Sequence, residues 1–425
     1  MKKAFSFVLS LLLVVPLCAQ SEFSIRANHW SRGEWRYGAL PEDEEGSQHA
    51  LFMMSSTALQ LDYKYQGLEV RVTPKHSGVW GAKGGGSIGL DEAWFGLRSK
   101  WGLFFKLGRQ LLSYDDQRIV GANDWVMSTN KHDALKLGFE RPVHRLHILL
   151  AFNQNNVNTN GGTYYTDGGQ VYKSMQMAWY HLDPIPQLGA SLMFLNTGMQ
   201  DIMVQGENIT QNQQLFGGFL DFHPRNLSVQ ASYYRQTGHD EYGLSIHAWM
   251  TSAEAVWQIV PAFRLNTGYF HLSGDENYFV PPQGALGMAR KTEVHGFNPL
   301  FGSHHQFYGA MDFFYLQTYY GGNTPGLQDF HLGLQMNPVK TLSLGAEYHL
   351  LATSVDIKDT SRLLGHEVEL DAGWQLMKDV KLQAGYSFMY GTETMKILKR
   401  SGAKNRLRWG WLMLVVTPEF FKIQK

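Results

Sequence analysis

The sequence predicts an all-β protein, a transmembrane antiparallel up-and-down β-barrel of about 18 strands, with 16 as the alternative count. Two observations carry this prediction. β-like segments fill nearly the whole chain of 425 residues, and the connections between them alternate short and long. Within the segments, apolar and polar residues alternate with the period of 2 typical of a strand that has one apolar face. A membrane barrel has this rhythm because tight turns lie at one rim and long loops at the other.

The N-terminal segment, residues 1–19, is predicted to be a secretory signal peptide, and residues 20–425 are predicted to form a single barrel domain. Lys2 and Lys3 give the segment a positive start, and residues 4–15 are apolar. The only cysteine of the chain lies in this segment, so the mature protein has neither disulfides nor thiol chemistry. Lipid attachment at that cysteine is the weaker alternative, because a leucine precedes it.

Each strand is expected to span about ten residues, the length of a tilted membrane strand. The strands are expected to begin near Phe23, Leu51, Gly67, Ser87, Trp101, Asp133, Val143, Val171, Leu188, Gln213, Leu227, His247, Ala262, Leu327, Thr341, Leu363, Val380 and Asn405. Their even number places both termini at the rim of tight turns, which would face the periplasm. Residues 422–425 follow the last aromatic pair and are expected to hang free there.

Alternation also predicts which charged residues face a wet lumen, because a Lys or Arg facing lipid at the midplane costs about 2–4 kcal/mol. The basic set is Arg26, Lys64, Arg71, Arg98, Lys106, Lys136, Arg145, Arg264, Lys381 and Arg408. The acidic set is Asp62, Glu69, Glu92, Glu140, Asp221, Glu254, Glu347, Glu367, Glu369 and Asp371. Since the two sets are equal in size, we expect a lattice of ion pairs rather than a lumen of one sign.

Aromatic residues at the ends of the apolar rows are expected to lie at the membrane interfaces. They are Tyr63, Tyr65, Trp179, Tyr233, Tyr348, Trp374, Tyr390, Trp409 and Trp411. A soluble β-sandwich is the alternative, but it leaves the alternation of loop lengths unexplained. The formal net charge of zero argues against a nucleic-acid partner. No cofactor and no metal site is predicted.

One stretch of sequence carries a family resemblance. It reads Leu-Gly-Arg-Gln at 107–110, then Tyr-Asp-Asp-Gln-Arg-Ile-Val-Gly at 114–121, Asp-Trp at 124–125 and Asp-Ala at 133–134. This pattern resembles the alginate-export family of outer-membrane channels. The resemblance implies an 18-stranded barrel and an arginine-lined conduit for an acidic polysaccharide, and it covers Arg109, Asp116, Arg118, Asp124 and Trp125. The equal numbers of inward acids and bases depart from a strongly positive conduit.

The loop at 111–132 is predicted to fold inward and to narrow the pore. Arg109 and Arg118 carry planar guanidinium groups that can bind carboxylates with two hydrogen bonds. Asp115, Asp116 and Asp124 lie close enough in sequence to be those carboxylates. Two interpretations remain open: these groups pair with one another and fix the loop to the wall, or the arginines contact solutes.

The long connection at 273–326 is the other candidate for a functional loop, since loops of this length are usually functional or disordered. Two interpretations remain open for it. It forms an outer lid or an inward-folded gate, or it is a mobile surface loop. The adjacent His304 and His305 are too weak a signal to predict a metal site.

These observations predict a monomeric outer-membrane channel for passive passage of polar or anionic solutes, with export of a polysaccharide as one candidate role. Membrane lipid, lipopolysaccharide and the barrel-assembly machinery are the expected partners. A structural or adhesion barrel that binds through its loops is the alternative function. A barrel-embedded hydrolase is a weaker one, because no motif selects a catalytic serine, histidine or acid.

Overall fold

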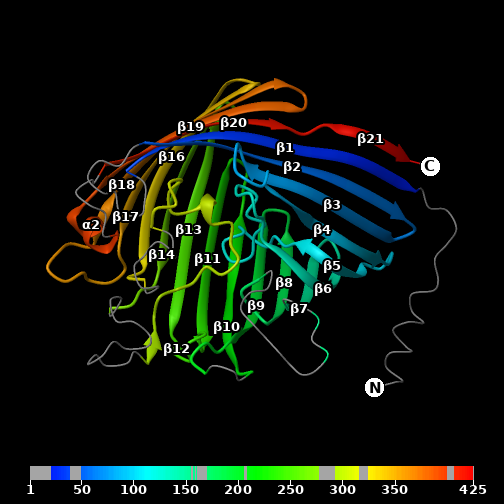
Figure 1. Ribbon diagram of the computed structural model, residues 1–425, viewed down its shortest axis with the longest axis horizontal. Coiled ribbons are helices and arrows are strands. Elements are labelled where there is room, and N and C mark those ends of the chain that lie inside the picture. The colour runs from blue at the N-terminus through cyan, green and yellow to red at the C-terminus, as the bar shows by residue number, and fades with distance from the viewer. Residues whose placement is uncertain are drawn as a thin grey trace.

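The computed structural model describes residues 21–38, 49–154, 157, 159, 170–204, 208–276, 292–314, 324–399 and 406–424 (Figure 1). Long strands dominate these segments. Their bounds are β1 Glu22–Tyr37, β2 Ala50–Tyr65, β3 Leu68–Val79, β4 Ser87–Arg98, β5 Leu103–Leu111, β6 Lys131–Glu140, β7 His144–Phe152, β8 Ser174–Ile185, β9 Leu188–Gln200, β10 Thr210–Phe222, β11 Leu227–Gly238, β12 Ser245–Ile246, β13 Ala248–Val260, β14 Phe263–Leu272, β15 Glu293–Val294, β16 Leu327–Val339, β17 Leu342–Ala352, β18 Leu363–Met377, β19 Val380–Gly391, β20 Arg406–Val416 and β21 Glu419–Gln424.

The strands close into one antiparallel barrel. Each long strand pairs with its neighbour in the chain, and β1 closes the ring by pairing with the C-terminal strands. β20 and β21 lie end to end against β1, so together they fill one position. The short strands β12 and β15 pair with each other outside the ring. The barrel therefore has 18 strand positions, and the predicted fold class and strand number are confirmed.

Connections at the two ends of the barrel differ in length as the sequence predicts. One end carries tight turns such as 66–67, 186–187 and 378–379, together with the start of β1 and the end of β21. The other end carries the long connections, including 112–130 and 273–326. The turn at 66–67 has positive φ at both Gln66 and Gly67, the backbone of a type I′ hairpin turn. A Cβ on Gly67 would come within 2.3 Å of the Arg98 carbonyl oxygen, so this turn requires glycine.

The predicted end of the chain needs a correction. Residues 422–424 do not hang free, because Lys422 pairs with Ser24 and Gln424 with Glu22 in the antiparallel ladder of β1. In the part of the chain that the structure describes, the connections contain two short helices, η1 (His304–Gln306) and α2 (Glu393–Lys399). Within the described residues, none of the helices is long and apolar enough to cross a membrane.

The outer surface of the barrel is apolar, with exposed side chains such as Leu192, Leu332, Leu370 and Leu412. Tyr63, Tyr65, Tyr233, Trp374 and Tyr390 are also exposed, as expected for interfacial aromatics. The interfacial prediction is wrong for Trp179, Trp409 and Trp411. Trp179 and Trp409 are buried on the lumen face, and Trp411, two residues from Trp409 on the same strand, packs against Trp125 of an inward loop.

The hydrophobic core lies inside the barrel, between its wall and two inward-folded loops. The loops supply Leu112, Ile119, Val120, Phe297, Phe301 and Tyr308, and the wall supplies Met175, Leu195, Leu215 and Leu351 among others. The long-loop half of the barrel interior is thus partly filled by protein (Figure 1).

Candidate pore constriction

Two long connections join inside the barrel into one body, which we call the constriction unit (residues 112–130 and 296–314). The Phe301 N–H donates to the Ile119 carbonyl at 3.0 Å, and the Gly121 N–H donates to the Phe301 carbonyl at 2.9 Å. The Ser303 N–H donates to the Gln117 carbonyl at 2.9 Å. The loop at 111–132 therefore folds inward, and residues 296–314 of the 273–326 connection fold inward with it.

Asp115 fixes the constriction unit to one side of the wall. Its carboxylate accepts hydrogen bonds from Ser191 Oγ at 2.6 Å, Trp179 Nε1 at 3.0 Å and Tyr234 OH at 3.2 Å. These donors come from β9, β8 and β11. Burial raises the pKa of the Asp115 carboxyl despite the three hydrogen bonds, which favour the ionised form. Asp115 thus contacts the wall directly and pairs with neither Arg109 nor Arg118.

Trp125 fixes the unit to the opposite side. Its ring stacks on His305 with centroids 4.2 Å apart, and the Arg32 guanidinium carbon lies 3.9 Å from its centroid. Arg32 Nη1 also donates to the Trp125 carbonyl at 3.1 Å. Arg32 is held in turn by Glu34, which also accepts from Trp409 Nε1 at 2.9 Å. Since β1 and β9 are eight places apart in a ring of 18, the segment from Asp115 to Trp125 crosses the lumen.

Arg118 is enclosed within the constriction unit rather than presented to solutes. Only 2% of its surface is exposed, and its Nε donates to Asp116 at 3.0 Å. Its guanidinium carbon lies 4.0 Å from the ring centroid of Phe270 and 3.9 Å from that of Phe307. Asp116 also accepts the Arg118 backbone N–H at 3.0 Å. Arg118 and Asp116 therefore stabilise the loop, and neither is placed to bind a passing carboxylate.

The placement of Arg109 at the constriction is wrong. Arg109 lies on the outer face of β5, in the row of the exposed Leu107, whereas the buried Gln110 faces inward. Its guanidinium makes a two-point ion pair with Asp133 of β6, at 2.9 and 2.8 Å. Asp133 is its cross-strand partner, so the pair is satisfied on the outside of the barrel.

The lumen face of β1–β5 carries a chain of ion pairs. Arg26 and Arg71 both bind Asp62 at 2.7 Å, Arg71 also binds Glu92 at 3.1 Å, and Lys106 approaches Glu92 at 3.9 Å. Farther along the wall, Arg145 of β7 pairs with Asp183. The cations of this wall are largely neutralised by neighbouring carboxylates.

The lumen face of β13–β19 is richer in acids. Glu254, Glu347 and Asp371 line a cavity of about 370 Å³ together with Arg264. Glu367 and Glu369 lie next to them on β18, and Lys381 lies on the inward row of β19. The predicted lumen position of Arg408 is wrong. Arg408 lies opposite Phe388 in the outward row and is followed by the buried Trp409, so its side chain faces outward at the rim.

A larger cavity of about 540 Å³ remains between the constriction unit and the wall of β1–β4. Trp30 and Trp125 contribute aromatic side chains to its lining, Trp125 by its edge because His305 and Arg32 cover its two faces, and Asp124 comes from the constriction unit. Its charged lining also includes Arg26, Lys75, Asp91 and Glu92. Of the residues predicted for the constriction, Asp124 and Trp125 are the ones that line open space here. The sequence did not point to four residues of this region, because only their contacts with the folded loops reveal their roles: Trp30, Arg32, Glu34 and His305.

Comparison with known proteins agrees with this architecture. A family described as "Alginate export" matches residues 86–360. Among solved structures, Pseudomonas aeruginosa OccK11 (OpdR) aligns with a TM-score of 0.62 and 14% identity, over 94% of this chain and 96% of that one. Pseudomonas aeruginosa OccK3 (OpdO) aligns at 0.61 and 15%, over 93% and 96%. OccD3 (OpdP) of the same organism aligns at 0.60 and 15%, over 94% and 92%. These likenesses show the shared fold.

No curated protein matches the chain. The family match covers more than half of its length and includes the whole of the inward loop at 112–130. The chain therefore belongs to the alginate-export family and is a porin-like channel for polar solutes in the bacterial outer membrane.

Proposed function

We propose that this channel passes saccharides by diffusion, through the cavity between the constriction unit and β1–β4. The observation that carries the proposal is the lining of that cavity, where the Trp30 ring and the edge of Trp125 lie among paired charged groups. Aromatic faces pack on the apolar face of a sugar ring, while charged and amide groups hydrogen-bond to hydroxyls. The family's description makes export the favoured direction.

The lining supports saccharides in general over a strongly anionic polymer. Arg26 and Lys75, the cations of this cavity, are paired with Asp62 at 2.7 Å and Asp91 at 2.9 Å. Neither Arg109 nor Arg118 is free to attract carboxylates, for the reasons given above. Lipopolysaccharide around the long loops and the barrel-assembly machinery stay predicted partners. The predicted signal peptide, residues 1–19, lies outside the described residues.

Single-channel recording in planar bilayers tests this function. We expect a conductance that neutral and uronic-acid oligosaccharides block transiently, and we expect Trp30→Ala to shorten these blockages because an aromatic contact in the cavity is lost. Trp374→Ala, on the outer wall, is the matched control and should behave as wild type. A purified barrel without conductance would instead favour the adhesion alternative, and turnover of an ester or lipid would favour the hydrolase.

A further inference from the structure

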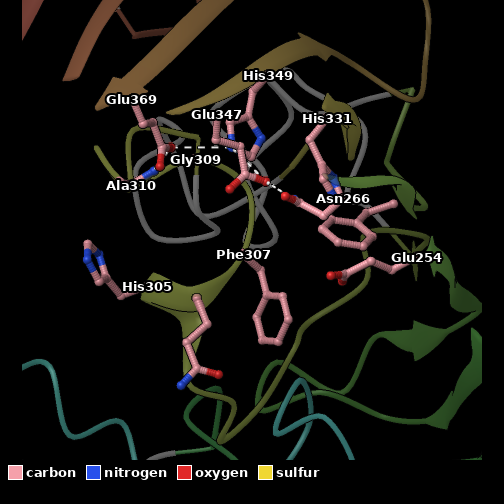
Figure 2. Close-up of a pocket in the computed structure, with 12 residues that line it drawn as sticks. Glu254, Asn266, His305, Phe307, Gly309, Ala310, His331, Glu347, His349 and Glu369 are labelled. Atoms are coloured by element: carbon pink, nitrogen blue, oxygen red, sulfur yellow. Dashed lines mark hydrogen bonds and ion pairs between the residues drawn. The ribbon is translucent and has the colours of Figure 1, made fainter. Parts of the chain in front are cut away.

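Three neighbouring strands present a cluster of acids and histidines to the lumen, away from the saccharide cavity. Asp329 and His331 come from β16, Glu347 and His349 from β17, and Glu367 and Glu369 from β18. In the strand register, His331 lies opposite His349, His349 opposite Glu367, and Glu347 opposite Glu369. A cavity of about 160 Å³ lies between this cluster and residues 305–310 of the constriction unit (Figure 2).

His349 is oriented by a buried carboxylate. Its Nδ1 lies 2.9 and 3.0 Å from the two oxygens of Asp329, which is fully buried. The carboxylate accepts a hydrogen bond, so it holds the proton on Nδ1. The other ring nitrogen, Nε2, lies 3.3 Å from Glu369 Oε1 and 3.9 Å from Glu347 Oε1, so without a bound ion it carries a proton that a metal ion would replace. A carboxylate behind a histidine, with acceptors in front of it, is the usual arrangement around a metal ligand.

The four carboxyl groups of the cluster outnumber its two imidazoles, so a protonated His349 compensates only part of their charge. Glu347 and Glu369 are directly opposite on neighbouring strands, where like charges destabilise a sheet. Glu367, beside them, is fully buried. Buried carboxylates are retained when they are paired or coordinate a metal ion. Arg118, the buried arginine of the neighbouring loop, is already engaged by Asp116, so it does not neutralise the cluster.

His331 provides a second, independent observation. Its side chain is 3% exposed and lines the same cavity. Within the part of the chain that the structure describes, its Nδ1 atom has no hydrogen-bond partner. A buried imidazole nitrogen normally has a partner, from protein, water or a bound ion. The cavity beside it has room for water molecules that complete a coordination sphere.

We propose that Glu347, His349 and Glu369 bind a divalent transition-metal ion of the Zn²⁺ class. One ligand atom from each of the three lies within 4.8 Å of the other two (Figure 2). One imidazole and two carboxylates suit Zn²⁺ or Mn²⁺, whereas Ca²⁺ takes oxygen ligands alone. Asp329 is the positioning residue behind His349, and His331 lines the same cavity and lies close to Asp329 and His349.

The ion would also hold the constriction unit. The Ala310 N–H donates to Glu369, and the Met311 N–H donates to Glu367 at 2.8 Å. Gly309 lies so close to Glu367 that a Cβ on it would be 2.5 Å from Oε2. Fixing Glu369 with a metal therefore fixes Ala310, and with it the loop beside Glu367, against β18. Metal binding should stabilise the loop without any need for solute.

The test uses full-length, tag-free protein in detergent, stripped with a chelator and then titrated with Zn²⁺ by calorimetry. We expect one Zn²⁺ ion per chain, a rise in Tm on binding, and ligand-field absorption when Co²⁺ is used instead. His349→Ala should abolish binding, and Glu347→Gln should weaken it at least ~10-fold. Asp329→Asn should weaken it about 10–100-fold, as loss of an orienting carboxylate does elsewhere.

Two control variants separate the site from general effects. His144→Ala removes a histidine from the outer face of β7, and Glu254→Gln removes a carboxylate that lines the cavity but is not a ligand. Both should bind Zn²⁺ like wild type. The proposal is overturned if the stripped wild type binds no Zn²⁺, or if Glu347→Gln, checked for folding by heat-modifiability, binds it unchanged. Blockage of the pore by saccharides is measured independently of Zn²⁺ binding. The metal-site proposal and the proposed channel function can therefore be contradicted separately.

Discussion

Asp115 is the residue whose hydrogen bonds should matter most for the constriction unit. Asp115→Asn keeps the size of the side chain but replaces one of the two acceptor oxygens with an amide donor that faces the donors of the wall. A buried donor left without its acceptor costs about 1–3 kcal/mol, so we expect the free energy of unfolding to fall by about 2 kcal/mol. We also expect larger current fluctuations in planar bilayers, because the loop is released from β8, β9 and β11. Asp124→Asn, in the same loop, is the control, and an Asp115→Asn channel as quiet as wild type would contradict this role.

The two arginines of the family motif should give opposite results. Arg109→Ala removes an ion pair on the outer wall, so single-channel conductance and ion selectivity should stay as in wild type. Arg118→Ala removes a cation enclosed by Phe270 and Phe307 and leaves Asp116 unpaired, so conductance should become unstable and Tm should fall. Reversal potentials in a salt gradient measure the first variant and heat-modifiability the second. A change of ion selectivity in Arg109→Ala would show that this residue acts in the pore, and would contradict its placement on the outer wall.

The errors of sequence reasoning at this scale have physical causes. Alternation tells the lumen face of a strand from its outer face by the difference in polarity between them. That difference disappears where both faces are apolar or both carry charged side chains. Trp179 looks interfacial because inward loops make the lumen face of β8 as apolar as its outer face. Arg109 is assigned to the constriction by the family motif and not by alternation, and its outer-face partner, Asp133, is 24 residues away in the sequence. Arg408 lies near the rim, where an outward charge is tolerated.

At the scale of elements, the constriction unit should respond to pH through His304. Burial lowers the pKa of His304 from its ordinary value of 6.5 to about 4. The packed loop thus binds fewer protons than the released loop between these values. Its stability should be highest above pH 6.5 and should fall as the pH drops toward 4, by on the order of 3 kcal/mol. Current fluctuations recorded from pH 7.5 to 4 should increase over this window.

His304→Gln provides the comparison, because its side chain does not titrate. In this variant the current fluctuations should no longer increase as the pH falls below 6.5. The pH dependence of loop stability that remains in this variant should have the opposite sign. The pKa of Asp115 is raised in the packed loop, so protonation of Asp115 favours the packed state. If wild type and His304→Gln showed the same pH dependence, another group would have to be responsible.

The strands themselves were predictable, while the contacts between loops were not. Alternation, turn positions and loop lengths act within ten or twenty residues, so they determine all 18 strand positions and the uneven rims. The bond between Phe301 and Ile119 joins segments about 180 residues apart. Nothing local in either segment specifies the other. The triad of Glu347, His349 and Glu369 is also invisible in the sequence, since it depends on the register between β17 and β18.

At the scale of the whole molecule, the closed barrel acts as a rigid frame that positions loops from several sides. The constriction unit is held by β8–β11 at Asp115, by β1 at Trp125 and by β18 at residues 310–311. These attachments divide the space inside the barrel. An aromatic cavity with paired charges lies beside β1–β4, and acid-rich cavities lie beside β13–β18. A solute therefore meets different chemistry on the two sides.

This division predicts the ion selectivity of the channel. Glu254 and Asp371 line the acid-rich cavity with Arg264 as the cation beside them, whereas the cations near β1–β4 are paired with carboxylates. We therefore expect a weak preference for cations in wild type. The double variant Glu254→Gln/Asp371→Asn should shift the reversal potential in a KCl gradient toward anions, because it removes two negative charges from a wall that has few positive ones. Lys75→Gln should shift it the other way, since Asp91 then loses its nearest cation. If the double variant left the reversal potential unchanged, ions would have to cross on the β1–β4 side alone.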